Sequence, residues 1–168
     1  MTLQDIGSIG GIIGALAVVV SLFYVGSQIR QNTAAVRSST AQAVHDNYAS
    51  WYTSIATSRE LTEIAIAGLK NFAGLAETDK GRFISAFMGF LSYSQNAFYQ
   101  WRAGSLSPQL WVGWEALIIN LVGAPGGKQF WAERGYAFGS EFRDHVENVL
   151  MKRQPAPEAK PFGAFKIG

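Results

Sequence analysis

The stretch that decides the fold is Ile6 to Ile29, IGSIGGIIGALAVVVSLFYVGSQI, which has no charged side chain and is bracketed by Asp5 and Arg30. As a helix this stretch would be about 36 Å long, and the hydrocarbon core of a bilayer is roughly 30 Å thick. Twelve of its 24 residues are Ile, Leu, Val or Phe. Together they favour insertion by about 4 to 7 kcal/mol as an upper estimate. The stretch therefore predicts one membrane-spanning helix.

Two other interpretations fit this stretch less well. A cleaved signal peptide begins with a positive region and has a shorter apolar stretch, whereas the residues before Ile6 include Asp5 and no Lys or Arg. A buried helix of a soluble core usually has a shorter uninterrupted apolar run. We therefore expect a retained anchor.

The basic residues on either side of the stretch predict its orientation. Arg30 and Arg37 follow it, and no Lys or Arg precedes it. Because basic residues gather on the cytoplasmic side of a span, we expect the N-terminus outside and residues 30–168 in the cytoplasm. Arg30 and Arg37 would also form a collar at the lipid headgroups.

Small residues recur at helical spacing within the stretch and predict a helix–helix contact face. In lipid, small residues four apart let two helix backbones approach closely. The alternative is that glycine is simply common in membrane helices. The face that we expect comprises Gly7, Gly10, Gly11, Gly14, Ala15, Ala17 and Ser21.

Composition limits the class of protein. The chain has 168 residues, no cysteine and a net charge of +2. Without cysteine, a disulfide framework, a thiol nucleophile and a thiolate metal site are all excluded. The basic residues are scattered, so we expect no nucleic-acid partner and instead a domain beside anionic lipid.

The rest of the chain reads as helical, because no segment alternates as a strand would. We expect an all-α protein with an anchor over residues 1–29, a helical domain over 30–153 and an extended tail over 154–168. Thr57 and Glu60 have the spacing of a capping box. The helices that we expect are residues 30–56 continuing the anchor, then 57–72, 79–102 and 108–122, a short one around 130–133, and 141–152.

The helix that ends at Arg102 should form the centre of the core. A second membrane span between Arg82 and Arg102 is an alternative, but the Ser, Gln and Asn side chains in between argue against it. Gly104 should end this helix with a left-handed residue. Its apolar stripe is Phe83, Phe87, Phe90, Leu91, Phe98 and Trp101, and that of the last helix is Phe142, Val146, Val149 and Leu150.

The tail, residues 154–168, holds three of the five prolines and cannot form regular helix. Extended proline-rich segments lose little entropy on binding. Phe162, Phe165 and Ile167 therefore predict a docking peptide, with a frayed terminus as the alternative.

A search for chemistry finds no catalytic, cofactor-binding or metal-binding motif. His45 and Asp46 are adjacent on a helix and so do not face each other. His145 lies one turn from Glu141, but two ligands without a third make a weak metal site. Four tryptophans at helical spacing could line an apolar pocket, although core packing is the commoner role. They are Trp101, Trp111, Trp114 and Trp131.

Three motifs carry a resemblance to known proteins. They are QIRQNTAAVRSSTAQAV at residues 28–44, NAFYQ at 96–100 and LWVGW at 110–114. The chain resembles an uncharacterised bacterial family of single-pass membrane proteins, in which such a span leads into a helical domain. The resemblance implies a bacterial inner-membrane protein and no assigned activity.

These observations predict a non-enzymatic, membrane-anchored subunit without a cofactor. It would self-associate or join a larger membrane complex through its glycine-rich span, its helical domain and its tail. The alternatives are a ligand-binding or sensory membrane protein, favoured by a pocket, and an oligomeric channel, favoured by a polar lumen.

Overall fold

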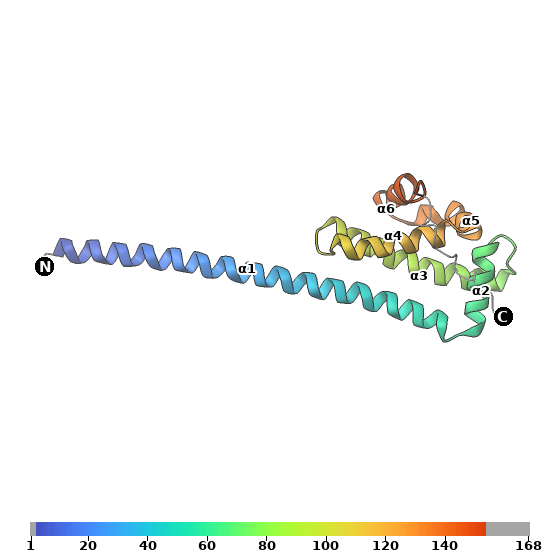
Figure 1. The fold of residues 1–168 in the computed structure, drawn as a ribbon, viewed down its shortest axis with the longest axis horizontal. Coiled ribbons are helices and arrows are strands. Elements are labelled where there is room, and N and C mark those ends of the chain that lie inside the picture. Colours follow the sequence, from blue (N-terminus) through green and yellow to red (C-terminus); the bar gives the residue numbers. More distant parts are fainter. Residues whose placement is uncertain (1–2, 154–168) are drawn as a thin grey trace. The chain divides into compact units, whose positions relative to one another are not determined.

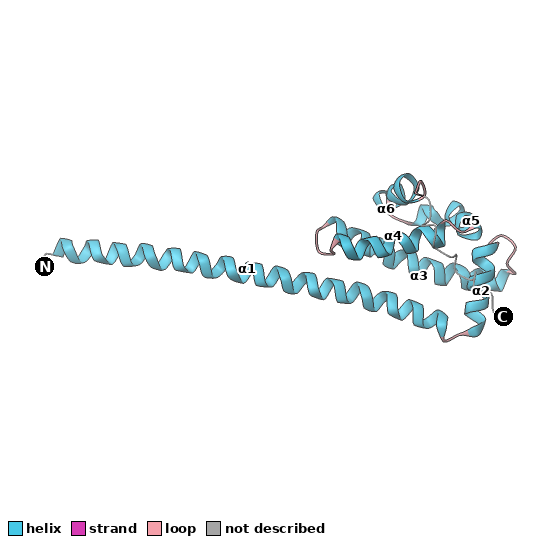
Figure 2. Ribbon diagram, in the orientation of Figure 1, coloured by secondary structure: helices cyan, strands magenta, loops and turns pink. Residues whose placement is uncertain are grey.

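Helices account for all the regular structure of the described chain, as the sequence predicts (Figure 2). The computed structural model describes residues 3–153, except the side chains of residues 3–10, 12, 13 and 15. No strand occurs among residues 3–153. The expected all-α fold class is confirmed.

Six α-helices follow one another along residues 3–153 (Figure 1). A 3-10 turn, Gly135–Ala137, precedes the last of them, and a π-helical turn, Val146–Leu150, follows it. The α-helices are α1 (Leu3–Ala56), α2 (Arg59–Lys70), α3 (Glu77–Arg102), α4 (Pro108–Val122), α5 (Pro125–Arg134) and α6 (Ser140–His145).

The chain divides into two compact units, Met1–Ser39 and Thr40–Gly168. α1 is continuous from Leu3 to Ala56, which confirms that the apolar stretch runs on into residues 30–56 as one helix. The sequence from Arg30 to Ala56 has no Gly or Pro to interrupt it.

The membrane-spanning character expected of Ile6 to Ile29 is not supported by the structure. Among the residues that are described, no helix is both long enough and apolar enough to cross a membrane. The run begins within the residues whose side chains are not described.

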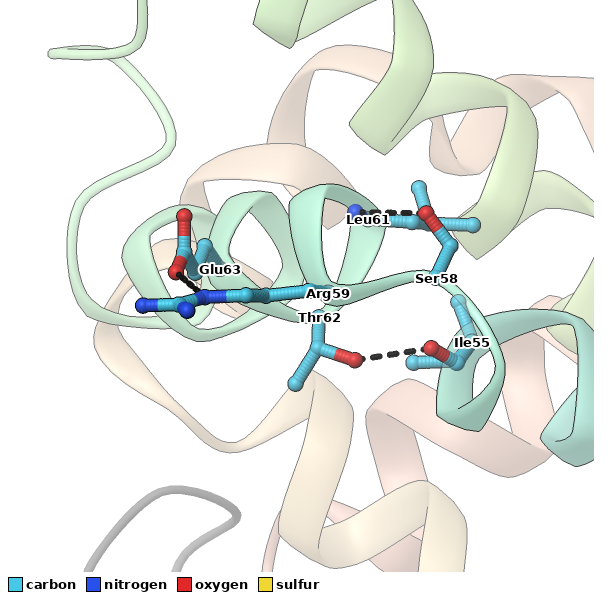
Figure 3. A network of polar contacts seen from close by, with 6 residues as sticks. All are labelled: Ile55, Ser58, Arg59, Leu61, Thr62 and Glu63. Carbon is cyan, nitrogen blue, oxygen red and sulfur yellow. Dashed lines mark hydrogen bonds and ion pairs between the residues drawn. The ribbon is translucent and has the colours of Figure 1, made fainter.

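Ser58 caps the N-terminus of α2, where its hydroxyl oxygen accepts a hydrogen bond from the backbone N–H of Leu61 at 3.2 Å (Figure 3). The Thr62 hydroxyl donates to the carbonyl oxygen of Ile55 at 2.7 Å, which ties α2 to the end of α1. Arg59 and Glu63 pair along the exposed side of α2 at 2.8 Å.

The predicted capping box of Thr57 and Glu60 is wrong. The Thr57 hydroxyl donates to the carbonyl oxygen of Thr53 at 2.8 Å, so Thr57 completes the last turn of α1. Glu60 pairs with Arg82 of α3 instead of reaching back to the backbone. The N-cap of α2 lies one residue later than predicted, because Ser58 can cap the helix as well as Thr57 can.

α3 is the centre of the core, as its aromatic stripe predicts. Phe83, Phe87, Phe90, Leu91 and Phe98 are all buried, and Trp101 packs against the core while partly exposed. Packing inside the helical domain therefore accounts for the uncharged run between Arg82 and Arg102. The helix ends at Arg102, and Gly104 has the left-handed φ of +74° that the sequence predicts for its end.

Two glycines let α2 pack closely against its neighbours: Gly126 lies at its contact with α5 and Gly68 at its contact with α3. A Cβ atom at Gly126 would overlap the backbone carbonyl oxygen of Gly68, and a Cβ atom at Gly68 would overlap the ring of Phe83. Only the absence of a side chain at each position permits these two contacts. α4 begins at Pro108, where the sequence predicts it, and Ser107 is its N-cap.

The last helix departs from the prediction in its second half. Phe142, Val146 and Leu150 are buried, but Val149 is exposed. The backbone N–H of Met151 donates to the carbonyl of Val146, which makes this turn π-helical. A π turn takes more residues than an α turn, so Leu150 returns to the buried face and Val149 does not.

Candidate functional site

The most exposed apolar segment of the described chain lies on α1 between residues 16 and 29. Its large side chains are consecutive or nearly so, and at 3.6 residues per turn they point in all directions around the helix except a sector of about 100° that holds Ala17, Ser21 and Gln28. Phe23, for example, is 72% exposed. The segment is therefore apolar around most of its circumference. Its exposed large residues are Leu16, Val18, Val19, Val20, Leu22, Phe23, Tyr24, Val25 and Ile29.

The predicted helix–helix face lies on the same part of α1. Gly11, Gly14, Ala17 and Ser21 are exposed, and a Cβ atom at Gly11 or Gly14 would meet nothing within 4 Å. The Ser21 hydroxyl donates to the carbonyl of Ala17 at 2.8 Å, so it is satisfied within the helix. The side-chain positions of Gly7, Gly10 and Ala15 lie outside the described residues.

The two arginines of the predicted collar follow this segment. Arg30 and Arg37 are exposed and lie on one side of α1, because seven residues make about two turns. Thr33 between them donates its hydroxyl to the carbonyl of Ile29 at 2.9 Å. Neither Arg30 nor Arg37 forms an ion pair with another described residue.

A partly open cavity of about 310 Å³ lies within the second unit. Its walls come from the C-terminal part of α1 and from α2, α3 and α4, with Trp51, Phe83 and Phe87 among them. The tryptophans proposed for a pocket do not line it. Trp111, Trp114 and Trp131 are buried in the core and Trp101 packs against it, so the commoner core role is the one observed.

The buried carboxylate of Glu115 on α4 is the centre of a cluster of polar side chains in the second unit. Oε1 of Glu115 accepts a hydrogen bond from the indole N–H of Trp111 at 2.8 Å. Its second oxygen, Oε2, accepts one from the guanidinium of Arg153. The side chain of Glu115 is 11% exposed and that of Arg153 is 50% exposed. Arg153 thus fastens the end of the described chain to α4.

His145 lies beside this carboxylate and not beside a metal site. Its Nε2 is 3.5 Å from Oε1 of Glu115, longer than a good hydrogen bond. Burial lowers the pKa of His145 below its ordinary value, and the nearby guanidinium groups of Arg153 and Arg102 act in the same direction. Glu115 opposes this shift without overcoming it. The folded environment therefore favours the neutral imidazole.

The described part of the chain provides no third ligand for the weak metal site that Glu141 and His145 suggested. Among the described residues, no group of three or more His, Cys, Asp or Glu side chains could hold a metal ion. His45 and Asp46 are both exposed, and Asp46 accepts a hydrogen bond from Gln42 at 2.8 Å. They do not form an acid–base pair.

The sequence reasoning missed both the cavity and the cluster around Glu115. A signal for the cluster was present, since Glu115 is the one charged residue of α4, PQLWVGWEALIINLV. A lone carboxylate in an apolar helix requires partners. No comparable signal marked the cavity. The proposed tail residues Phe162, Phe165 and Ile167 lie outside the described residues.

Comparison with known proteins yields no match to a family, to a curated protein or to a solved structure. The resemblance to an uncharacterised bacterial family therefore stays a prediction.

Proposed function

We propose that the protein is a non-enzymatic, membrane-anchored subunit whose anchor is the stretch from Ile6 to Ile29. The observation that carries the proposal is the exposure of large apolar side chains around most of the circumference of α1 between residues 16 and 29. A helix with so broad an apolar surface needs an apolar environment on most of its sides. Lipid supplies this, whereas a single protein neighbour covers one side only.

The sequence extends this argument to a full span. The uncharged run continues from Leu16 back to Ile6, giving 24 residues in all. That length matches a hydrocarbon core of roughly 30 Å. We propose a bacterial inner-membrane location, with the N-terminus outside and the helical domain in the cytoplasm, because Arg30 and Arg37 follow the span.

The small residues of the span support association with another membrane helix. Gly14, Ala17 and Ser21 lie on one side of α1 at spacings of three and four. The open space around Gly14 leaves room for a second backbone to approach. Because no hydrophobic effect drives helices together in lipid, membrane helices usually associate through close packing of small residues. The partner would be a second copy of this chain or another membrane subunit.

The association is tested by replacing Gly14 with Ile and measuring the mass of the purified full chain in mild detergent. We expect Gly14→Ile to shift the oligomer towards monomer, because a branched side chain keeps the backbones apart. Gly26→Ile is the matched control: Gly26 also has open space around it, but it lies about 120° around the helix from Gly14. Equal masses for the parent and both variants would contradict the glycine face.

A further inference from the structure

The cavity in the second unit is built as a preformed apolar site. The indole N–H of Trp51 donates to the carbonyl oxygen of Ala86 at 2.8 Å, which fixes the Trp51 ring between α1 and α3. Phe83 and Phe87 stack with their ring centroids 5.0 Å apart. Because these walls are held by packing and a hydrogen bond, the space does not depend on a flexible loop.

The residues that line the cavity disfavour a charged ligand. None of the thirteen residues that line it is charged. A charged ligand would lose its hydration there without gaining a counter-charge. The site therefore suits an uncharged molecule.

Aromatic rings form a substantial part of the same lining, beside aliphatic side chains. Tyr48, Trp51, Tyr52, Phe83 and Phe87 contribute five of its side chains. Aromatic pairs stack or meet edge to face, with a gain beyond the area that they bury. Flat ring systems thus match these walls better than a flexible chain, which would also lose rotational freedom on binding.

Asn120 gives the cavity a polar group that has no partner among the described residues. It is partly buried on α4, lines the cavity and makes no side-chain hydrogen bond to any residue of the described part of the chain. Ligand pockets typically combine apolar walls with a few such groups that fix orientation. Its amide can both donate and accept.

We propose that this cavity binds a compact, uncharged aromatic molecule of two or three rings with one hydrogen-bonding group, which Asn120 holds. The volume of about 310 Å³ is at the lower end of the range for small-molecule sites. All the lining residues lie between Tyr48 and Leu121, within one compact unit. The inference therefore does not depend on the membrane anchor.

The proposal is tested with 2-naphthol, which has two fused rings and one hydroxyl. It is titrated calorimetrically into the full chain in phosphatidylcholine nanodiscs, and the heat from empty nanodiscs is subtracted. We expect saturable binding of one molecule per chain. Ala65→Leu, which fills part of the cavity, should weaken binding about tenfold or more, because the added side chain takes the space of the ligand. Ala67→Leu on the exposed side of α2 is the matched control and should bind like the parent.

A second variant tests the role of Asn120 and keeps the proposal testable if Ala65→Leu does not fold. Asn120→Leu should weaken binding of 2-naphthol about tenfold and leave binding of naphthalene, which lacks the hydroxyl, unchanged. Heat equal to that of empty nanodiscs, or equal binding by Ala65→Leu and Ala67→Leu, would overturn the proposal. Binding that appears only after deletion of residues 154–168 would also overturn it, since the tail would then be the natural occupant.

Discussion

His145 is the residue whose protonation the fold opposes most clearly. Its imidazole packs against the rings of Phe98, Trp101 and Trp111, at centroid distances of 5.0 to 5.8 Å. Glu115 is the one nearby group that favours the charged form, and Arg153 and Arg102 disfavour it. Since burial dominates, the folded chain binds this proton less readily than the unfolded chain does.

Because the folded chain binds the proton of His145 less readily than the unfolded chain, we expect the folded state to lose stability on acidification. The pKa of His145 is lowered from its ordinary value of 6.5, so stability is fully present above about pH 6.5. It should fall as the pH drops from there and stop falling below the lowered pKa. Thermal unfolding of the full chain, followed by circular dichroism from pH 7.5 to 5, measures the effect.

The variant His145→Gln should remove this slope, whatever its effect on stability at pH 7.5. His45→Gln, at an exposed position of α1, is the matched control and should keep the slope of the parent. A parent chain whose melting temperature does not change over this range would show that His145 is not protected from protonation.

Gly126 shows what single-residue reasoning can and cannot predict. The sequence predicts that the fifth helix begins only around residue 130, but Gly126 and Gly127 already lie in the first turn of α5. Gly126 packs there against the backbone of Gly68, which is distant in sequence. A pattern along one chain segment contains no information on that partner, so this role could not be predicted.

At the scale of the helices, local patterns predicted most of the fold. The apolar periodicity of α3, the Ser107–Pro108 start of α4 and the end of α3 at Gly104 depend on neighbouring residues only, and all were confirmed. The errors came where two local signals compete, at Thr57 and Ser58, or where the helix changes its period, at Val146–Leu150. The cavity depends on how four helices pack, which no local pattern contains.

The observed start of α2 predicts different effects for two neighbouring hydroxyls. Ser58→Ala should destabilise the second unit by about 1 kcal/mol, because the N–H of Leu61 loses its side-chain partner. Thr57→Ala should cost less, since the Thr57 hydroxyl bonds only to a carbonyl within α1. Thermal unfolding of the two variants in mild detergent compares them, and a larger loss for Thr57→Ala would restore the capping box that the sequence suggested.

At the scale of the whole molecule, the proposal joins an anchor to a helical domain that carries its own core and cavity. The core of the domain is formed by residues from Val44 onward, among the described residues. The membrane assignment therefore depends on the stretch from Ile6 to Ile29 alone, and the decisive test is directed at this stretch.

That test measures the fraction of the full chain, expressed in a bacterium, that floats with membranes in a density gradient after an alkaline carbonate wash. The account predicts that the parent chain floats. It predicts that Val19→Arg with Val20→Arg is washed off, since two arginines cost about 5 to 7 kcal/mol at a helix centre and offset the insertion energy. Val19→Leu with Val20→Leu is the matched control and should float. A parent chain released as soluble protein by the wash would contradict the anchor.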